Sequence, residues 1–190
     1  FPYTTLFRSN ICSLAGLLCT MFAIYFAIGG HFIASIISIL WAVLFDWLDG
    51  IIARKMTGRT KEQGIFGGQL DSMIDIVSFG VFPAIVLLSY GGYNAWFIPG
   101  AFIIVAACAI RLSYFNIYGL IESKTYNGLS VDSNGIILAF AFLFESFFSH
   151  FTFSIILYAL LMSLAALNLS PMPIPKLAGK WVYVDRKSVV

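Results

Sequence analysis

Residues 46–80 read DWLDGIIARKMTGRTKEQGIFGGQLDSMIDIVSFG and carry four aspartates at the edges of two apolar runs. Asp46 and Asp49 are spaced three residues apart, and Asp71 and Asp75 are spaced four apart. On a helix, both spacings place the two side chains of a pair on one face. Because the connection between the two pairs is short, we expect antiparallel neighbouring helices that bring all four carboxylates to one depth.

The apolar runs around this stretch indicate an integral membrane protein. Hydrophobic residues make up 60% of the 190-residue chain and charged residues only 11%. A soluble domain carries about 25% charged residues, and about 20 apolar residues span a bilayer as a helix. We predict an all-α, polytopic membrane protein with six transmembrane helices over residues 11–28, 32–54, 67–90, 95–117, 131–148 and 151–167.

The basic residues predict the orientation of these helices. Lysine and arginine gather at the break between the second and third segments, at the break between the fourth and fifth, and after the sixth. The other three breaks carry neither residue. Since basic residues mark cytoplasmic loops, both termini and the aspartates are expected on the cytoplasmic side, with the chain in the cell membrane of a prokaryote.

Four carboxylates at membrane depth need a cation to neutralise them. One aspartate at the centre of a membrane helix costs about 2.5–3.5 kcal/mol on insertion scales, and mutual repulsion adds to that cost. Arg54 supplies only one positive charge. Hard divalent ions with oxygen ligands fit such a cluster, so we predict Mg²⁺ or Mn²⁺, with Ca²⁺ also possible. Two ions bridged by carboxylates would be able to clamp a diphosphate.

The same stretch resembles the signature of the CDP-alcohol phosphatidyltransferases. That signature reads D-x2-D-G-x2-A-R, a spacer, and then G-x3-D-x3-D. The positions that meet it here are Asp46, Asp49, Gly50, Ala53, Arg54, Gly67, Asp71 and Asp75. The spacer holds twelve residues rather than the usual eight, and the extra length falls in the charged loop, where insertions are tolerated.

The resemblance implies a homodimeric enzyme with six membrane helices and two metal ions. Such an enzyme transfers the phosphatidyl group of a CDP-linked lipid to a small alcohol and releases CMP. By position, it assigns metal binding to Asp46, Asp49, Asp71 and Asp75. It also makes Asp75 the general base on the acceptor hydroxyl. It assigns the CDP pocket to Gly50, Ala53 and Gly67, with Arg54 at its edge.

Two further segments, 77–84 (VSFGVFPA) and 111–116 (RLSYFN), resemble the phosphatidylserine synthase branch of that family. The branch implies CDP-diacylglycerol and L-serine as substrates, and Arg111 is expected to pair with the serine carboxylate. An ordinary snorkelling arginine is the alternative. Residues 128–134 read GLSVDSN, so the usual Gly-Leu-Pro is lost and Asp132 is added. Glycerol 3-phosphate, inositol phosphate or another alcohol is therefore the nearest alternative acceptor.

Two classes other than a transferase compete with this interpretation. A divalent-cation transporter would use the aspartates as a transit site, but the second and third segments are almost wholly apolar beyond them. A silent membrane scaffold has no need of four carboxylates at membrane depth. We expect no nucleic-acid partner. Residues 10–184 are expected to form a single domain, with non-native ends at 1–9 and 185–190.

Overall fold

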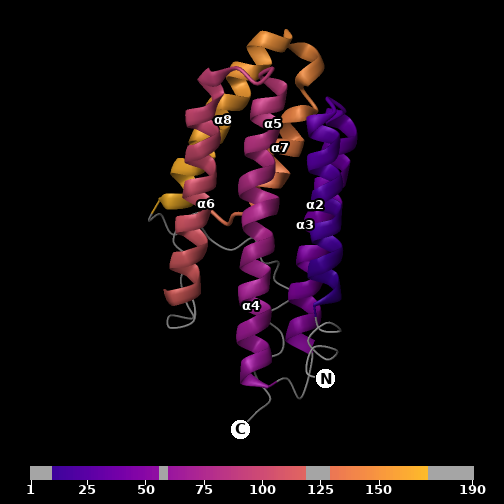
Figure 1. Ribbon diagram of the computed structural model, residues 1–190, viewed down its shortest axis with the longest axis vertical. Coiled ribbons are helices and arrows are strands. Elements are labelled where there is room, and N and C mark those ends of the chain that lie inside the picture. The colour runs from indigo at the N-terminus through magenta and orange to yellow at the C-terminus, as the bar shows by residue number, and fades with distance from the viewer. Residues whose placement is uncertain (1–9, 56–59, 119–128, 171–190) are drawn as a thin grey trace, which may run out of the picture.

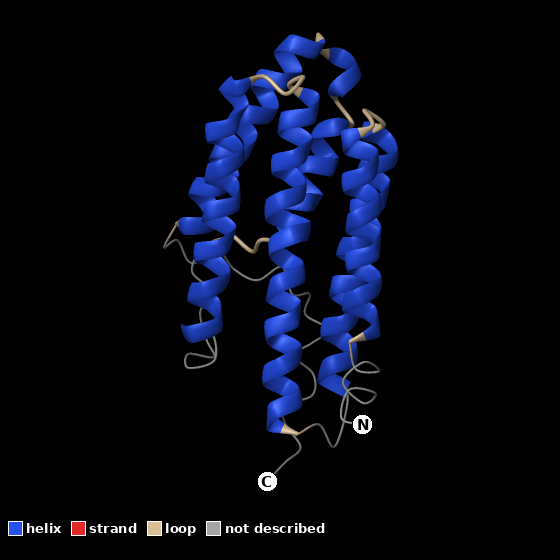
Figure 2. Cartoon of the chain, viewed as in Figure 1, coloured by secondary structure: helices blue, strands red, loops and turns tan. Residues whose placement is uncertain are grey.

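The computed structural model describes residues 10–55, 60–118 and 129–170, and all regular structure in them is helical (Figure 2). The all-α class is therefore confirmed, whereas both predicted non-native ends lie outside the described residues. The elements are α2 (Ile11–Ile28), α3 (Phe32–Lys55), α4 (Lys61–Asp75), the π-helix η1 (Ile76–Val81), α5 (Phe82–Tyr90), the 3₁₀-helix η2 (Ala95–Phe97), α6 (Ile98–Tyr118), α7 (Ser133–Phe142), the 3₁₀-helix η3 (Glu145–Phe147) and α8 (His150–Leu169).

The helices form an antiparallel bundle around one long central helix (Figure 1). Elements α4, η1 and α5 follow one another without a break and make up this central helix. On one side of it, α2 packs against α3, and on the other side α6 packs against α8. Helix α7 packs against α3 and η1. The central helix therefore contacts every part of the bundle, including the part that carries Asp46.

Within the described residues, five helices are long and apolar enough to cross a membrane, and the predicted sixth span is not confirmed. The five are Ile11–Ile28, Phe32–Ile52, Lys61–Tyr90, Ala95–Ile117 and His150–Leu169. The segment expected to span residues 131–148 instead forms the ten-residue helix α7 and then η3. Asp132 caps α7 through its carboxylate, which accepts a hydrogen bond from the Ser133 N–H. The polar Asp132 thus starts a helix that is too short to cross a bilayer alone.

The helix that bears Asp71 and Asp75 begins at Lys61, six residues before the predicted start at residue 67. Thr60 and Gln63 form a capping box, because the Thr60 hydroxyl accepts from the Gln63 N–H and the Thr60 N–H donates to the Gln63 side chain. Such a box satisfies two N-terminal donors of a helix in water. A prediction that follows apolar residues alone misses this polar first turn.

Large apolar side chains cover the outside of the bundle. Trp96 is 83% exposed, Phe147 78% and Ile33 73%. Soluble proteins rarely expose apolar patches of this extent, whereas lipid chains solvate them. Inside, α2 turns a row of small residues toward its neighbours, namely Ser13, Gly16, Thr20, Ala23 and Ala27. Small residues let membrane helices pack closely, which brings α2 against both α3 and the central helix.

Candidate metal centre

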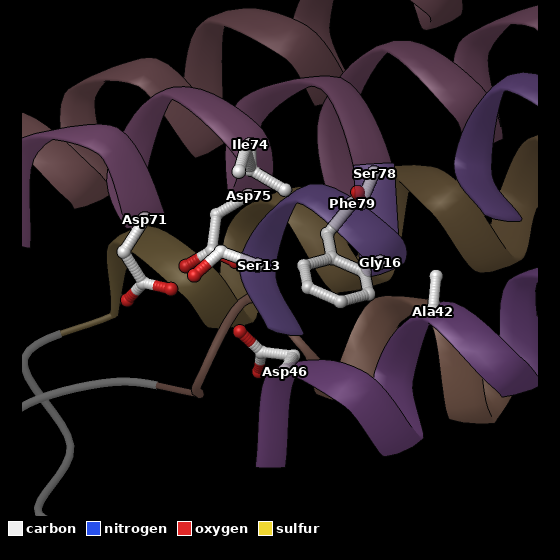
Figure 3. Close-up of a pocket in the computed structure, with 9 residues that line it drawn as sticks. All are labelled: Ser13, Gly16, Ala42, Asp46, Asp71, Ile74, Asp75, Ser78 and Phe79. Carbon is white, nitrogen blue, oxygen red and sulfur yellow. The ribbon is translucent and has the colours of Figure 1, made fainter. Parts of the chain in front are cut away.

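Three of the four predicted carboxylates meet in the structure. Asp46 on α3 and Asp71 and Asp75 on α4 each offer one oxygen, and these three oxygens lie within 4.8 Å of one another. Figure 3 shows the three side chains turned toward a common space. The i, i+4 spacing of Asp71 and Asp75 places both on one face of α4, and that face is turned toward Asp46.

A pocket opens at these carboxylates between α2, α3 and the central helix (Figure 3). Its lining comprises Ser13, Gly16, Ala42, Asp46, Asp71, Ile74, Asp75, Ser78 and Phe79. Serine, glycine and alanine side chains leave room beside the acidic groups. Ile74 and Phe79 add apolar surface to the lining, and a charge beside apolar surface interacts more strongly with the carboxylates than it would in water.

The cluster fits a hard divalent cation. Among the described residues, Asp75 Oδ1 is buried and has no hydrogen-bond partner. A buried polar atom without a partner costs about 1–3 kcal/mol, and the neighbouring carboxylates add repulsion. A bound cation would satisfy the lone oxygen and neutralise the charges together. All three donors are carboxylate oxygens, which is the ligand type that Mg²⁺, Mn²⁺ and Ca²⁺ prefer.

Asp49 has a partner of its own. Its Oδ2 accepts a hydrogen bond of 2.7 Å from the Ser13 hydroxyl of α2. Asp49 lies one helical turn beyond Asp46 on α3, and it is not one of the three residues whose oxygens converge. The structure therefore separates the four aspartates into a group of three and a fourth that is held by α2.

The predicted CDP-pocket residues lie on the ends of the same two helices. Gly67 is buried on α4 one turn before Asp71, and Gly50 is exposed on α3 beside Asp49. For Ala53 and Arg54 the structure describes the backbone alone, in the last turn of α3. The CDP pocket assigned to these positions stays a prediction.

Arg111 lies on α6 and is buried, with 8% of its surface exposed. Its Nε donates to the Leu129 carbonyl at 3.5 Å. A snorkelling arginine would extend into water, and this side chain instead lies inside the protein. A pairing of Arg111 with the serine carboxylate stays a prediction.

Two polar residues near the cluster, Ser13 and Asp132, were not predicted to contact the residues around it. Ser13 is a buried polar residue in an otherwise apolar helix, and the small-residue row on α2 was the signal available for it. Asp132 Oδ2 accepts a hydrogen bond of 3.1 Å from the indole Nε1 of Trp47, the residue next to Asp46. The start of α7 is thereby tied to the helix that carries the first metal-ligand candidate.

An apolar helical bundle with a half-buried carboxylate cluster defines an integral membrane protein with a candidate metal centre. The chain belongs to the CDP-alcohol phosphatidyltransferase family, whose model matches residues 6–170. That family is dependent on divalent metals, in agreement with the cluster formed by the three aspartates.

Several curated relatives are similar to this chain. An archaetidylserine synthase of Methanothermobacter thermautotrophicus is 34% identical over 83% of this chain and 64% of its own length. A CDP-diacylglycerol–serine O-phosphatidyltransferase of Methanocaldococcus jannaschii is 35% identical over 64% of this chain and 57% of its own. One from Helicobacter pylori is 32% identical over 57% and 45%. The chain thus spans about half to two thirds of the relatives' length. No solved structure matches it.

Proposed function

We propose that the protein transfers the phosphatidyl group of CDP-diacylglycerol to the hydroxyl of L-serine and releases CMP. The observation that carries this proposal is the meeting of three carboxylates around the unpartnered Asp75 Oδ1, within a chain of this family. The names of the three relatives differ in the lipid but share serine. That shared acceptor favours serine over the other alcohols.

The reaction is a substitution at the phosphorus that bears the lipid. The serine oxygen forms a bond to this phosphorus, the bond from phosphorus to the CMP oxygen breaks, and the hydroxyl proton leaves. Divalent metal, when bound, supplies neutralisation of the charge that develops on the phosphates. Asp46, Asp49 and Asp71 are proposed to hold the metal, and Asp75 to hold metal and to accept the proton.

In this proposal the two substrates reach the site from different phases. The lipid chains stay in the bilayer, while the nucleotide and serine come from water. In this proposal Gly50, Ala53 and Gly67 leave room for the CDP group and Arg54 lies at its edge. Arg111 would pair with the serine carboxylate, for which its planar guanidinium is suited.

The proposed orientation and assembly follow from the charges and from the family. By the positive-inside rule, the basic loop before α4 supports a location of the carboxylates at the cytoplasmic face of a prokaryotic cell membrane. Two copies of the chain are proposed to associate as a homodimer. A cytoplasmic site would draw CDP-linked lipid from the inner leaflet and serine from the cytosol.

CMP release from CDP-diacylglycerol in detergent tests the proposal. Separate reactions contain L-serine, glycerol 3-phosphate, inositol phosphate or no acceptor, each with Mn²⁺, with Mg²⁺ or with EDTA. We expect release that needs both serine and metal, and that returns when metal is restored after EDTA. Release with another alcohol alone would replace serine as the acceptor. No release with any alcohol, from folded protein that binds Mn²⁺, would contradict the transferase function.

A further inference from the structure

The central helix changes its winding immediately after Asp75. Residues Ile76–Val81 form a π-helix, and Pro83 follows in the first turn of α5. Proline has no N–H, and its ring crowds the carbonyl four residues earlier. That carbonyl belongs to Phe79, so the α-helical donor for Phe79 O is missing from the sequence. In a bilayer, a carbonyl released in this way is satisfied by groups from neighbouring helices.

Two neighbouring helices supply donors to Phe79 O. Asn134 Nδ2 of α7 donates to it at 3.1 Å, and the Cys108 thiol of α6 donates at 3.3 Å. Asn168 Nδ2 of α8 in turn donates to Asn134 Oδ1 at 3.3 Å. Asn134 and Cys108 are 0% exposed and Asn168 is 1% exposed. A buried amide in this position makes strong hydrogen bonds because no water competes.

The same segment forms part of the metal pocket. The Phe79 ring lines the pocket beside the carboxylates (Figure 3), and Asp75 precedes Phe79 by four residues. A Cβ added at Gly135 would lie 3.3 Å from the Phe79 ring, so α7 packs closely on that ring. Asn134 and its neighbour Gly135 therefore hold both the carbonyl and the ring of Phe79.

We infer that Asn134 is a positioning residue, which fixes the π-helix and thereby aims Asp71 and Asp75 at Asp46. One residue corresponds to about 100° of rotation in an α-helix, which has 3.6 residues per turn. The position of the π-helix therefore sets the rotation of α4, which carries the carboxylates, relative to α5, which follows the π-helix. This inference rests on the proposed metal centre, and Asn134 itself contacts no substrate.

Mn²⁺ binding to the full chain in detergent tests the role of Asn134. The loss of the free-ion EPR signal gives the dissociation constant for wild type, Asn134→Leu and Ser35→Ala. Asn134→Leu keeps the branched shape of the side chain and removes the amide. Groups that orient metal ligands change metal affinity by about ten- to a hundredfold, so we expect the dissociation constant of Asn134→Leu to rise by about tenfold or more.

Ser35→Ala is the matched control, because Ser35 is also 0% exposed and donates across helices to a carbonyl, that of Ala23, at 2.7 Å. It lies at the other end of α3 from Asp46. We expect it to lower the melting temperature and leave Mn²⁺ affinity unchanged. Unchanged Mn²⁺ affinity in Asn134→Leu, or equal weakening in Ser35→Ala, would show that Asn134 stabilises the bundle without aiming the carboxylates.

Cys108 supplies a second test that does not depend on Asn134→Leu folding. Cys108→Ser keeps a donor for Phe79 O, and Cys108→Ala removes it. Because Asn134 still donates to Phe79 O in both variants, we expect their Mn²⁺ affinities to stay near wild type. A tenfold loss of affinity in Cys108→Ala would contradict the assignment of the positioning role to Asn134. The assay contains no acceptor, so a wrong acceptor assignment does not affect it. Wild-type protein that binds no Mn²⁺ would overturn the metal centre, and this inference with it.

Discussion

Asp46, Asp71 and Asp75 bring three negative charges into a space lined largely by apolar and small residues. Nothing in the packing of the bundle requires this arrangement, and Asp75 Oδ1 gains no hydrogen bond from it. In the proposed metal centre, a bound divalent cation would reduce the repulsion and supply a partner for the unsatisfied oxygen.

Asp75→Asn removes the proposed base and one metal ligand while keeping the side-chain shape. General-base catalysis contributes about 10²- to 10⁴-fold, so we expect serine-dependent CMP release to fall by at least that range. Glu145→Gln is the control, since Glu145 accepts from the Tyr90 hydroxyl and is separated from the carboxylate cluster by the length of α5. Residual activity near wild type in Asp75→Asn would contradict the role of Asp75.

Ser13→Ala removes the hydroxyl that donates to Asp49. We expect kcat/KM for CMP release to fall about tenfold, as for other residues that orient metal ligands. Ser163→Ala is the matched control, because the Ser163 hydroxyl bonds only to the Ala159 carbonyl of its own helix. Equal activities of the two variants would mean that Asp49 needs no orientation from α2.

The sequence predicted the acidic cluster and could not predict its neighbours. The aspartates follow from spacing within one helix, which local geometry determines. The Ser13–Asp49 bond joins residues 36 positions apart, and the Asn134–Phe79 bond joins residues 55 apart. Such bonds depend on which faces of α2, α7 and the central helix meet. The packing of these helix faces cannot be predicted from a single sequence.

The central helix differs from its prediction at its start and in its middle. Its apolar pattern predicted one span, but the capping box extends it to Lys61, and Pro83 sits just after the unexpected π-helix. The shortness of α7 is related to the central helix, because the polar first turn of α7 forms a hydrogen bond with that helix. Asn134 would be costly inside a membrane helix, and here it satisfies Phe79 O.

Gly80 tests the close packing of the π-helix on α6. A Cβ at this position would lie 3.2 Å from Cys108 Cβ, which belongs to the neighbouring helix. Overpacking of this kind costs about 1–3 kcal/mol, so we expect Gly80→Val to lower the melting temperature in detergent. Gly64→Val is the control, since a Cβ there meets nothing within 4 Å. Equal melting temperatures would mean that α6 and η1 are not in close contact.

Over the described residues, the whole molecule is a helical bundle with many large apolar side chains exposed on its outside. Composition predicted the membrane class and the apolar segments, because the hydrophobic content is incompatible with a soluble surface. The predicted count of six spans depended on treating residues 131–148 as one helix. Segment length alone does not reveal that Asp132 starts a shorter helix there.

The proposed orientation places Lys61 in the cytoplasm and Trp96 outside the cell membrane. Cysteine introduced at each position can be labelled with a maleimide that does not cross membranes. In intact bacterial cells we expect Trp96→Cys to react and Lys61→Cys to react only after lysis. Wild type is the control for the three native cysteines. The opposite labelling pattern would put the carboxylates on the outer face.

The location of bound Mn²⁺ tests the metal centre most directly. Crystals of the full chain soaked in Mn²⁺ would show the ion as an anomalous difference peak. We predict a peak bounded by the carboxylates of Asp46, Asp71 and Asp75, and the loss of that peak in Asp71→Asn. A peak elsewhere, or none between these three side chains in crystals that contain Mn²⁺, would contradict the account of the site.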